Sequence, residues 1–156
     1  MKGKQPSTAS DRMARNISPE LYSTIRTMWD RHVELEVAEG KLEQAVEETM
    51  AEDCVYELLL TGERWEGHTG AMDFYDLLNA AFPTAEWELL DICIGPQGVL
   101  GIANMTAKME APFGGFDETG KEVHWRIINM FEWDPDAEKF HGERLHYFGP
   151  WPPSTP

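Results

Sequence analysis

Two spacings of hydrophobic residues divide this chain, a helical one in its first half and a strand-like one in its second half. Apolar side chains recur every three or four positions from Leu21 to Gly40, which predicts an amphipathic helix. Ser18 is a typical helix N-cap residue, and Pro19 suits the first helical position. From residue 87 onward apolar and polar residues alternate, which predicts strands.

The remaining predicted elements complete an α+β pattern. A second helix is predicted over residues 42–50, and a third from Thr69 to the break at Pro83. Strands are predicted over residues 54–60, 87–94, 99–111, 123–133 and 140–148. Glycine and proline in the segments between the last four strands predict hairpins. Helices followed by a run of long strands indicate three helices packed on one face of an antiparallel sheet.

Polarity sets the expected domain boundaries. Residues 1–16 are polar and lack periodicity, so we expect a disordered N-terminal arm. Residues 17–149 are expected to form one domain, in keeping with a length of 156 residues. Residues 150–156 are rich in proline, and we expect them to leave the sheet as an extended tail.

Charge and cysteine usage narrow the classes of function. The chain has 13 basic and 28 acidic residues, a formal net charge of −15. Such a surface repels phosphate groups, so we expect neither nucleic-acid nor membrane binding. The N-terminal segment lacks the apolar stretch of a signal peptide, and Cys54 and Cys93 lie in strand-like runs as small hydrophobes. These features predict a cytoplasmic protein.

The sequence contains no motif for a metal or a cofactor. Its five histidines show none of the spacings typical of metal sites, and no Cys/His ligand set forms. Glycine-rich phosphate-binding motifs are also missing from the sequence. His32 and Glu36 lie one helical turn apart, and we interpret them as residues at the edge of the apolar stripe of the first helix. We therefore expect neither a metal nor a cofactor.

Asn129 interrupts the apolar face of a predicted strand. The other members of that face are Val123, Trp125, Ile127, Phe131 and Trp133. A lone amide on such a face needs hydrogen-bond partners, since leaving it unpaired costs about 1–3 kcal/mol. Two interpretations stay open. Asn129 is either satisfied by backbone or a buried water, or it contacts an oxygen of a ligand.

Three segments of the chain carry a resemblance to a known family. They are WEGHTGAMDFYDLLNAAFP, APFGGFDETGKEVHWRIINMFEW and EKFHGERLHYF. Over residues 21–148 the chain resembles the SnoaL-like polyketide cyclases, a branch of the nuclear transport factor 2-like fold. The resemblance implies a small cone, in which a strongly curved antiparallel sheet of four to six strands wraps helices around an apolar pocket.

The resemblance predicts the fold better than it predicts the chemistry. Asn129 falls where the related ketosteroid isomerases place a protonated carboxylic acid that binds the substrate oxygen. The isomerases' general base would fall near Leu58, which cannot move a proton. The Arg-x-Asp pattern of the related limonene epoxide hydrolases is absent from the sequence as well. SnoaL-type cyclases carry an acidic residue on the last strand, and here the matching slots hold Leu145, His146 or Phe148.

The sequence alone does not decide which side chains of residues 140–148 point into the fold. Either Glu143, Leu145 and Tyr147 point inward, or Arg144, His146 and Phe148 do. The second choice places a titratable imidazole near Asn129, where it would suit proton transfer close to neutral pH. On that choice Asn129 and His146 are the candidate catalytic residues.

A flat apolar molecule with one or two oxygens is the expected ligand. The residues expected to bind it are Trp29, His32, Tyr56, Leu58, Trp65, Met105, Trp125 and Phe131. We predict a cofactor-free lyase or isomerase acting on an apolar, polyketide- or terpenoid-like carbonyl compound. The alternative is a non-catalytic ligand-binding or dimerisation module of the same fold. We also expect a homodimer that pairs through the outer face of the sheet, which carries Asn104 and Thr106.

Overall fold

The computed structural model describes residues 16–148, and it has the α+β architecture predicted from the sequence. The expected arm lies outside this range except for its last residue, and the expected tail lies outside it wholly. The helices are α2 (Pro19–Val37), α3 (Leu42–Thr49) and α4 (Gly67–Ala81). The strands are β1 (Met50–Leu58), β2 (Glu63–Glu66), β3 (Glu86–Gly95), β4 (Gly98–Lys108), β5 (Glu122–Asp134) and β6 (Lys139–Phe148).

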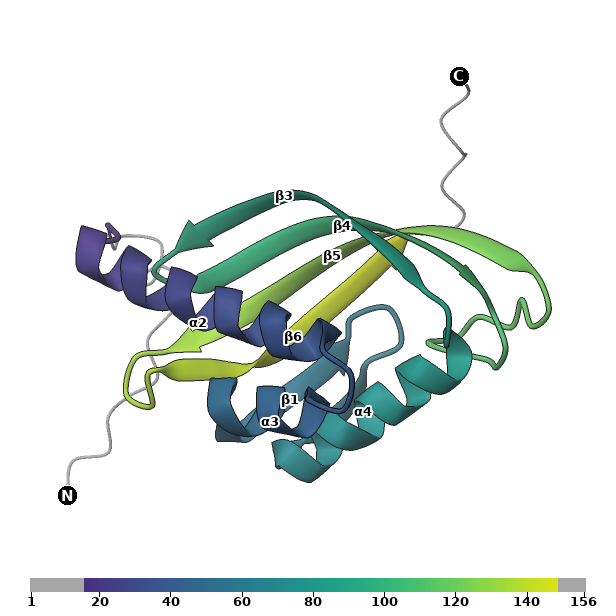
Figure 1. The fold of residues 1–156 in the computed structure, drawn as a ribbon, viewed down its shortest axis with the longest axis horizontal. Coiled ribbons are helices and arrows are strands. Elements are labelled where there is room, and N and C mark those ends of the chain that lie inside the picture. The colour runs from purple at the N-terminus through teal and green to yellow at the C-terminus, as the bar shows by residue number, and fades with distance from the viewer. Residues whose placement is uncertain (1–15, 149–156) are drawn as a thin grey trace.

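The six strands form one curved sheet in the order β2-β1-β6-β5-β4-β3, and the helices lie on its concave side (Figure 1). Neighbouring strands are antiparallel, except that β1 and β6 run parallel. The expectation of a wholly antiparallel sheet therefore needs this correction. β1 and β6 come from opposite ends of the domain, so no hairpin joins them and periodicity within each strand says nothing of their relative direction.

The ends of the helices follow local side-chain chemistry. The Ser18 hydroxyl accepts a hydrogen bond from the Leu21 backbone N–H at 3.1 Å, which confirms the predicted N-cap. The third helix begins at Gly67, two residues before the predicted start at Thr69. A Cβ at Gly70 would lie 2.8 Å from the Trp65 backbone, so the first turn of α4 packs directly on β2. This close contact, and not a capping side chain, sets where the helix begins.

The short strand β2 was not predicted. Its four residues are mostly exposed and polar, so they show no alternation. β2 forms because a tight turn brings it back along β1, with the Gly62 N–H donating to the Leu58 carbonyl at 2.8 Å. Gly62 has a φ of 75°, which glycine adopts without strain.

The core fills the space between the concave face of the sheet and the helices. The apolar row predicted on β5 is buried there, and only Asn129 of that row is partly exposed. Trp29 of α2 packs edge-on against Phe131 of β5, with ring centroids 4.9 Å apart. The predicted row is thus the inner face of β5, and it carries Asn129 into the interior.

Candidate functional site

The register of the strands places the candidate residues in rows across the concave face. One row contains Ile92, Gly101, Asn129, Leu145 and Leu58. The next row contains Ile94, Val99, Phe131, Glu143 and Tyr56. Asn129 and Glu143 are therefore diagonal neighbours on adjacent strands, within reach of one another's side chains.

The last strand turns Glu143, Leu145 and Tyr147 inward. His146 pairs with Ile128 on the outer face and packs against Phe148, with ring centroids 4.4 Å apart. The expectation that His146 shares a pocket wall with Asn129 is therefore wrong. The reason is a bulge, because two residues separate Phe140 from Glu143 where one separates their partners on β5.

Glu143 is a buried carboxyl that no cation accompanies in the described part of the chain. Asn129 Nδ2 donates a hydrogen bond to Glu143 Oε1 at 3.1 Å, and the Glu143 residue is 5% exposed. Burial raises the pKa of Glu143 well above its ordinary value, the Glu36 charge raises it further, and the Asn129 bond lowers it in part. Burial without a counterion thus favours the protonated, neutral form of the Glu143 carboxyl.

One oxygen of each partner has no hydrogen bond among the described residues. Within residues 16–148, every fully enclosed side-chain nitrogen or oxygen has a hydrogen-bond partner. Glu143 Oε2 and Asn129 Oδ1 have no partner among those residues, so neither of these atoms is fully enclosed. Gly101 makes room for the Asn129 side chain, because a Cβ there would lie 2.4 Å from Asn129 Oδ1.

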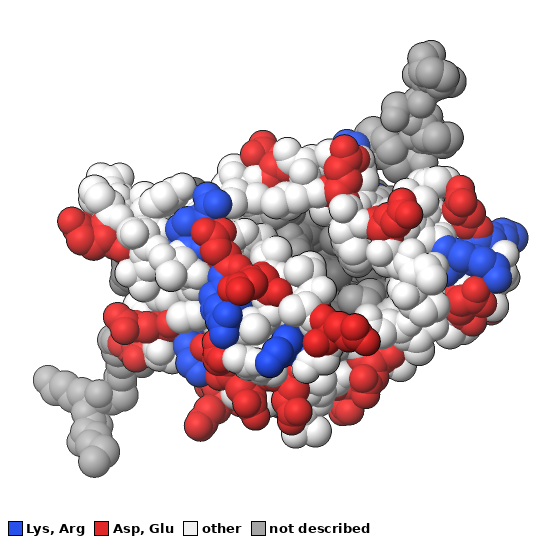
Figure 2. Space-filling view, viewed as in Figure 1, with Lys and Arg blue, Asp and Glu red and all other residues white. Residues whose placement is uncertain are grey.

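Part of the concave face near this pair is exposed. Trp87 and Leu89 point to the inner side of β3, yet they are 50% and 56% exposed. Ala103, opposite Leu89, is also partly exposed. Figure 2 shows the molecule hollowed near the centre of this side, between α2 and β3, with acidic residues around it. The candidate site is the Asn129–Glu143 pair together with this partly exposed apolar part of the concave face.

A second polar cluster lies between α2, α3, α4 and β1. Tyr75 OH donates to Glu36 Oε1 at 3.0 Å and lies 3.4 Å from Tyr56 OH. His32 Nδ1 lies 2.8 Å from Thr49 Oγ1. Burial lowers the pKa of His32, against an opposing effect of the Glu36 carboxylate, so its imidazole is neutral.

The two tyrosines of this cluster remain phenols. Burial raises the pKa of Tyr56 well above its ordinary value, and the Glu143 carboxyl raises it further. Burial and the Glu36 charge do the same for Tyr75. Tyr56 is the cross-strand neighbour of Glu143, so the cluster adjoins the Asn129–Glu143 pair. Both phenols can act as hydrogen-bond donors.

The predicted binding residues lie on the inner side of the fold. Trp29, His32, Tyr56, Leu58, Met105, Trp125 and Phe131 are buried, and Trp65 is partly buried beside Phe74. Their contact with a ligand stays a prediction. Tyr75 and Glu143 were not among the residues predicted to form the site. An inward carboxyl, that of Glu143, does lie on the last strand. It is two residues before Leu145, the first position that was compared with the acidic residue of the cyclases. It also belongs to the first of the two possible inward faces of this strand.

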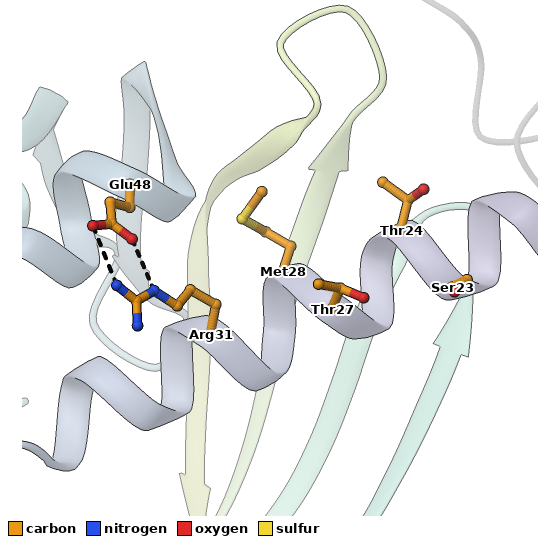
Figure 3. A pocket seen from close by; sticks show the side chains of 6 residues that line it. All are labelled: Ser23, Thr24, Thr27, Met28, Arg31 and Glu48. Carbon is orange, nitrogen blue, oxygen red and sulfur yellow. Dashed lines mark hydrogen bonds and ion pairs between the residues drawn. The ribbon is translucent and has the colours of Figure 1, made fainter.

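A separate groove of about 430 Å³ lies along the outside of α2 (Figure 3). Its lining is Ser23, Thr24, Thr27, Met28, Arg31 and Glu48. Arg31 Nε binds Glu48 Oε2 at 2.8 Å, and both side chains are well exposed. Surface ion pairs of this kind are common on proteins and carry no reactive group. The groove is therefore not the candidate site.

Two further features bear on the class of protein. In the part of the chain that the structure describes, no three His, Cys, Asp or Glu side chains are grouped to hold a metal ion. No helix among residues 16–148 is long and apolar enough to span a membrane.

Comparisons with known proteins agree with this architecture. No curated protein matches the sequence. A protein from Jannaschia sp. CCS1, described as a SnoaL-like polyketide cyclase, is similar in structure (TM-score 0.71, 18% identity, 86% of this chain and 91% of that one). AclR from Streptomyces galilaeus, described as a hydroxylase, is also similar (TM-score 0.61, 15% identity, 83% of this chain and 92% of that one).

A third similar structure is IdmH from Streptomyces antibioticus, described as a polyketide cyclase (TM-score 0.55, 18% identity, 80% of this chain and 89% of that one). At these identities the likeness extends to the fold alone. The sequence model of the SnoaL-like domain matches residues 29–139, which is more than half of the chain. The chain therefore belongs to the SnoaL-like domain family.

Proposed function

We propose that this protein is a cofactor-independent lyase or isomerase that acts on a small apolar carbonyl compound. Glu143 is its general acid, and Asn129 orients it. The observation that carries the proposal is a buried carboxyl without a counterion, whose Oε1 is held by Asn129 and whose Oε2 has no partner among the described residues. Carboxyls with strongly raised pKa values that adjoin a cleft are candidates for catalysis.

The proposed chemistry follows from the direction of the hydrogen bond. Asn129 Nδ2 holds Glu143 Oε1, which leaves Oε2 to carry the acidic proton. A carbonyl oxygen placed there gains a hydrogen bond that strengthens as negative charge develops on it. A carboxylic acid kept neutral by apolar surroundings serves this purpose in other enzymes.

The surroundings favour an uncharged, apolar ligand. Trp87, Leu89 and Ala103 offer apolar surface beside the polar pair. The net charge of −15 opposes binding of anions. The similar structures described as polyketide cyclases support a polyketide-like compound as one member of this class.

One observation favours the alternative, a pocket that binds a ligand without changing it. Leu58 is fully buried in the same row as Asn129, at the place where the isomerases' base was expected. An acid without a base can bind an oxygen but cannot enolise a ketone. The two functions differ in one measurable respect, which is exchange of the α-protons of a bound ketone.

Deuterium exchange into 1-tetralone, an apolar bicyclic ketone, tests the proposal. We expect the wild-type protein to speed exchange at the α-carbon in D₂O, measured by NMR. Glu143→Gln removes the acidic proton and keeps the shape, so the rate should fall about 100-fold or more. The control is Glu122→Gln, a change at an exposed acid on β5. Binding of the ketone without any faster exchange would favour the non-catalytic alternative.

We also propose that the outer sheet face pairs two copies of the chain. No helix of the described part covers this face, and Leu100 and Phe148 are exposed on it. Around them lie polar pairs such as Arg126 Nε donating to Asn104 Oδ1 at 3.1 Å. An apolar centre with a polar rim is typical of interfaces. Sedimentation at micromolar concentration should give a dimer, and a monomer of 17.8 kDa would contradict the proposal.

A further inference from the structure

We infer that Glu36 is the base of this site, and that Tyr75 and His32 position it. This inference rests on the proposed function, because it supplies the proton acceptor that Glu143 and Asn129 do not provide. It also gives a function to the buried polar cluster, in which the sequence analysis placed His32 and Glu36 only at the edge of an apolar stripe.

The Glu36 side chain turns inward at the border of the hollow. Glu36 lies in the last turn of α2, the end that adjoins the hollow (Figures 1 and 2). Its side chain is 35% exposed, yet Oε1 accepts a hydrogen bond from the buried Tyr75 hydroxyl. Glu34 on the same helix is 69% exposed and pairs with Arg31 at the surface. Of these two acids, only Glu36 is both in contact with solvent and hydrogen-bonded to a buried side chain.

Thr49 determines which nitrogen of His32 carries the proton. The Thr49 hydroxyl donates its single hydrogen to the Ala45 carbonyl at 2.6 Å. It must therefore accept from His32, so Nδ1 carries the proton of the neutral ring. The other nitrogen, Nε2, keeps a free lone pair. Nε2 lies 3.8 Å from Glu36 Oε2 and 3.5 Å from Tyr75 OH.

One more proton can bind between Glu36 and His32. Tyr75 uses its hydrogen on Glu36 Oε1, so it has none to give to His32 Nε2. Glu36 Oε2 and His32 Nε2 are thus two acceptors that face each other with no hydrogen between them. A proton that binds Glu36 Oε2 stays on that oxygen and faces the lone pair of His32 Nε2, 3.8 Å away. Glu36 then becomes neutral, and no charged imidazolium forms in the interior.

The two carboxyls divide the acid and the base roles. Glu36 and Glu143 lie on either side of the Tyr56–Tyr75 pair, and the charge of Glu36 helps to keep Glu143 protonated. Two titratable groups whose surroundings separate their protonation states are the pattern of an acid–base pair. Tyr56 and Tyr75 are the other titratable groups between them, and both stay protonated.

The step balances without another reactant. Glu36 Oε2 takes the proton from the carbon next to the carbonyl group, and the C–H electron pair forms the new C=C bond. The carbonyl π pair takes the proton from Glu143 Oε2, so the products are an enol, a neutral Glu36 and a Glu143 carboxylate. The reverse step restores both residues. Exchange follows because the partly exposed Glu36 trades its proton with solvent between the two steps.

Variants of Glu36 and Tyr75 test the inference in the 1-tetralone exchange experiment. Glu36→Gln should lower the exchange rate about 100-fold or more, with the affinity for the ketone unchanged in tryptophan fluorescence. The matched control is Glu34→Gln, the same change two residues earlier on α2. Tyr75→Phe should lower the rate about tenfold without weakening binding, because Glu36 loses its orienting bond. Its control is Tyr22→Phe, at an exposed tyrosine of α2.

The outcomes separate this inference from the proposed function. If Glu143→Gln abolishes exchange and Glu36→Gln does not, Glu36 is not the base and the general acid stands. If the wild-type protein binds the ketone and gives no exchange, both proposals fail. A ¹⁵N NMR spectrum of His32 adds a test that needs no activity. We expect the proton on Nδ1 and a lower His32 pKa in Glu36→Gln, and a proton on Nε2 would overturn the inference.

Discussion

Glu143 and Arg144 are adjacent on β6, but their side chains lie in opposite surroundings. Arg144 lies on the outer face, where its guanidinium binds Glu132 at 2.9 Å and lies 3.8 Å from Glu57. Glu143 lies on the inner face, where its only partner among the described residues is the neutral Asn129 amide. One step along a strand thus separates a solvated ion pair from a neutral acid.

The difference comes from solvation. Water screens the Arg144 pairs, so each contributes about 0–1 kcal/mol and can be lost without consequence. No comparable solvent surrounds Glu143, so ionising it would be costly, and burial favours its protonated form. A carboxyl kept in that state is a poor stabilising element and a good proton donor. The contrast shows that adjacent residues of one strand can hold a screened ion pair on one face and a carboxyl without a counterion on the other.

The largest expected effect is on the pH dependence of stability. The folded state raises the pKa of Glu143, so its favourable contribution is present below its ordinary value near 4.5 and is lost as pH rises toward the folded value. Wild-type stability should therefore decline above pH 5, relative to Glu143→Gln, by up to about 1.4 kcal/mol per pH unit. Urea unfolding of both proteins at several pH values measures this. Parallel profiles would contradict the burial argument.

Asn129→Leu should have the next largest effect. The change removes the only hydrogen bond to Glu143 in the described part of the chain, and it leaves a buried carboxyl without a partner. The expected cost is about 1–3 kcal/mol of unfolding free energy. Asn79→Leu, at an exposed asparagine of α4, is the control.

A double variant sharpens that prediction. In Asn129→Leu with Glu143→Leu both partners become apolar, so most of the lost stability should return. Additive losses in this double-mutant cycle would mean that the two side chains do not interact in solution.

Gly101→Ala should lower the stability by a similar or smaller amount, because it disturbs the same Asn129–Glu143 pair. The new Cβ would lie 2.4 Å from Asn129 Oδ1 and would push the amide away from Glu143. We expect a loss of about 1–2 kcal/mol in chemical unfolding. Combining it with Asn129→Ala removes the clash, so the second change should cost little. An equal loss in the Asn129→Ala background would show that the glycine serves the backbone instead.

Arg144→Ala should have the smallest effect. Its partners are exposed or partly exposed, so we expect a loss of about 0–1 kcal/mol that shrinks further at high salt. Thermal unfolding at low and high ionic strength measures it. A loss larger than that of Asn129→Leu would reverse the comparison between the two faces of β6.

The fold was predictable from the sequence because its main signals are local. Helical spacing after Ser18 and alternation on the later strands depend on residues close together in the chain. β2 and the parallel pairing of β1 with β6 were not predictable in this way. β2 is too short and polar to show a period, and the pairing depends on contacts across most of the domain.

The site was predictable in part, for the same physical reason. Asn129 was found because it breaks an otherwise apolar row. Glu143 was missed because both faces of β6 mix polar and apolar residues, and the bulge near Gly142 shifts the register by one residue. The position of Tyr75 in the sequence is that of an ordinary core residue of a helix. The inward turn of Glu36 depends on a partner in another helix, which no local pattern reveals.

The protonation state of Glu143 at pH 7 tests the central claim most directly. An infrared spectrum of the protein should contain a protonated-carboxyl band that disappears in Glu143→Gln and shifts in Asn129→Leu. The band should persist at neutral pH, because burial and the Glu36 charge hold the pKa of Glu143 well above its ordinary value. A Glu143 that is ionised at pH 7 would contradict the account, since it could neither donate a proton nor act as the neutral half of an acid–base pair.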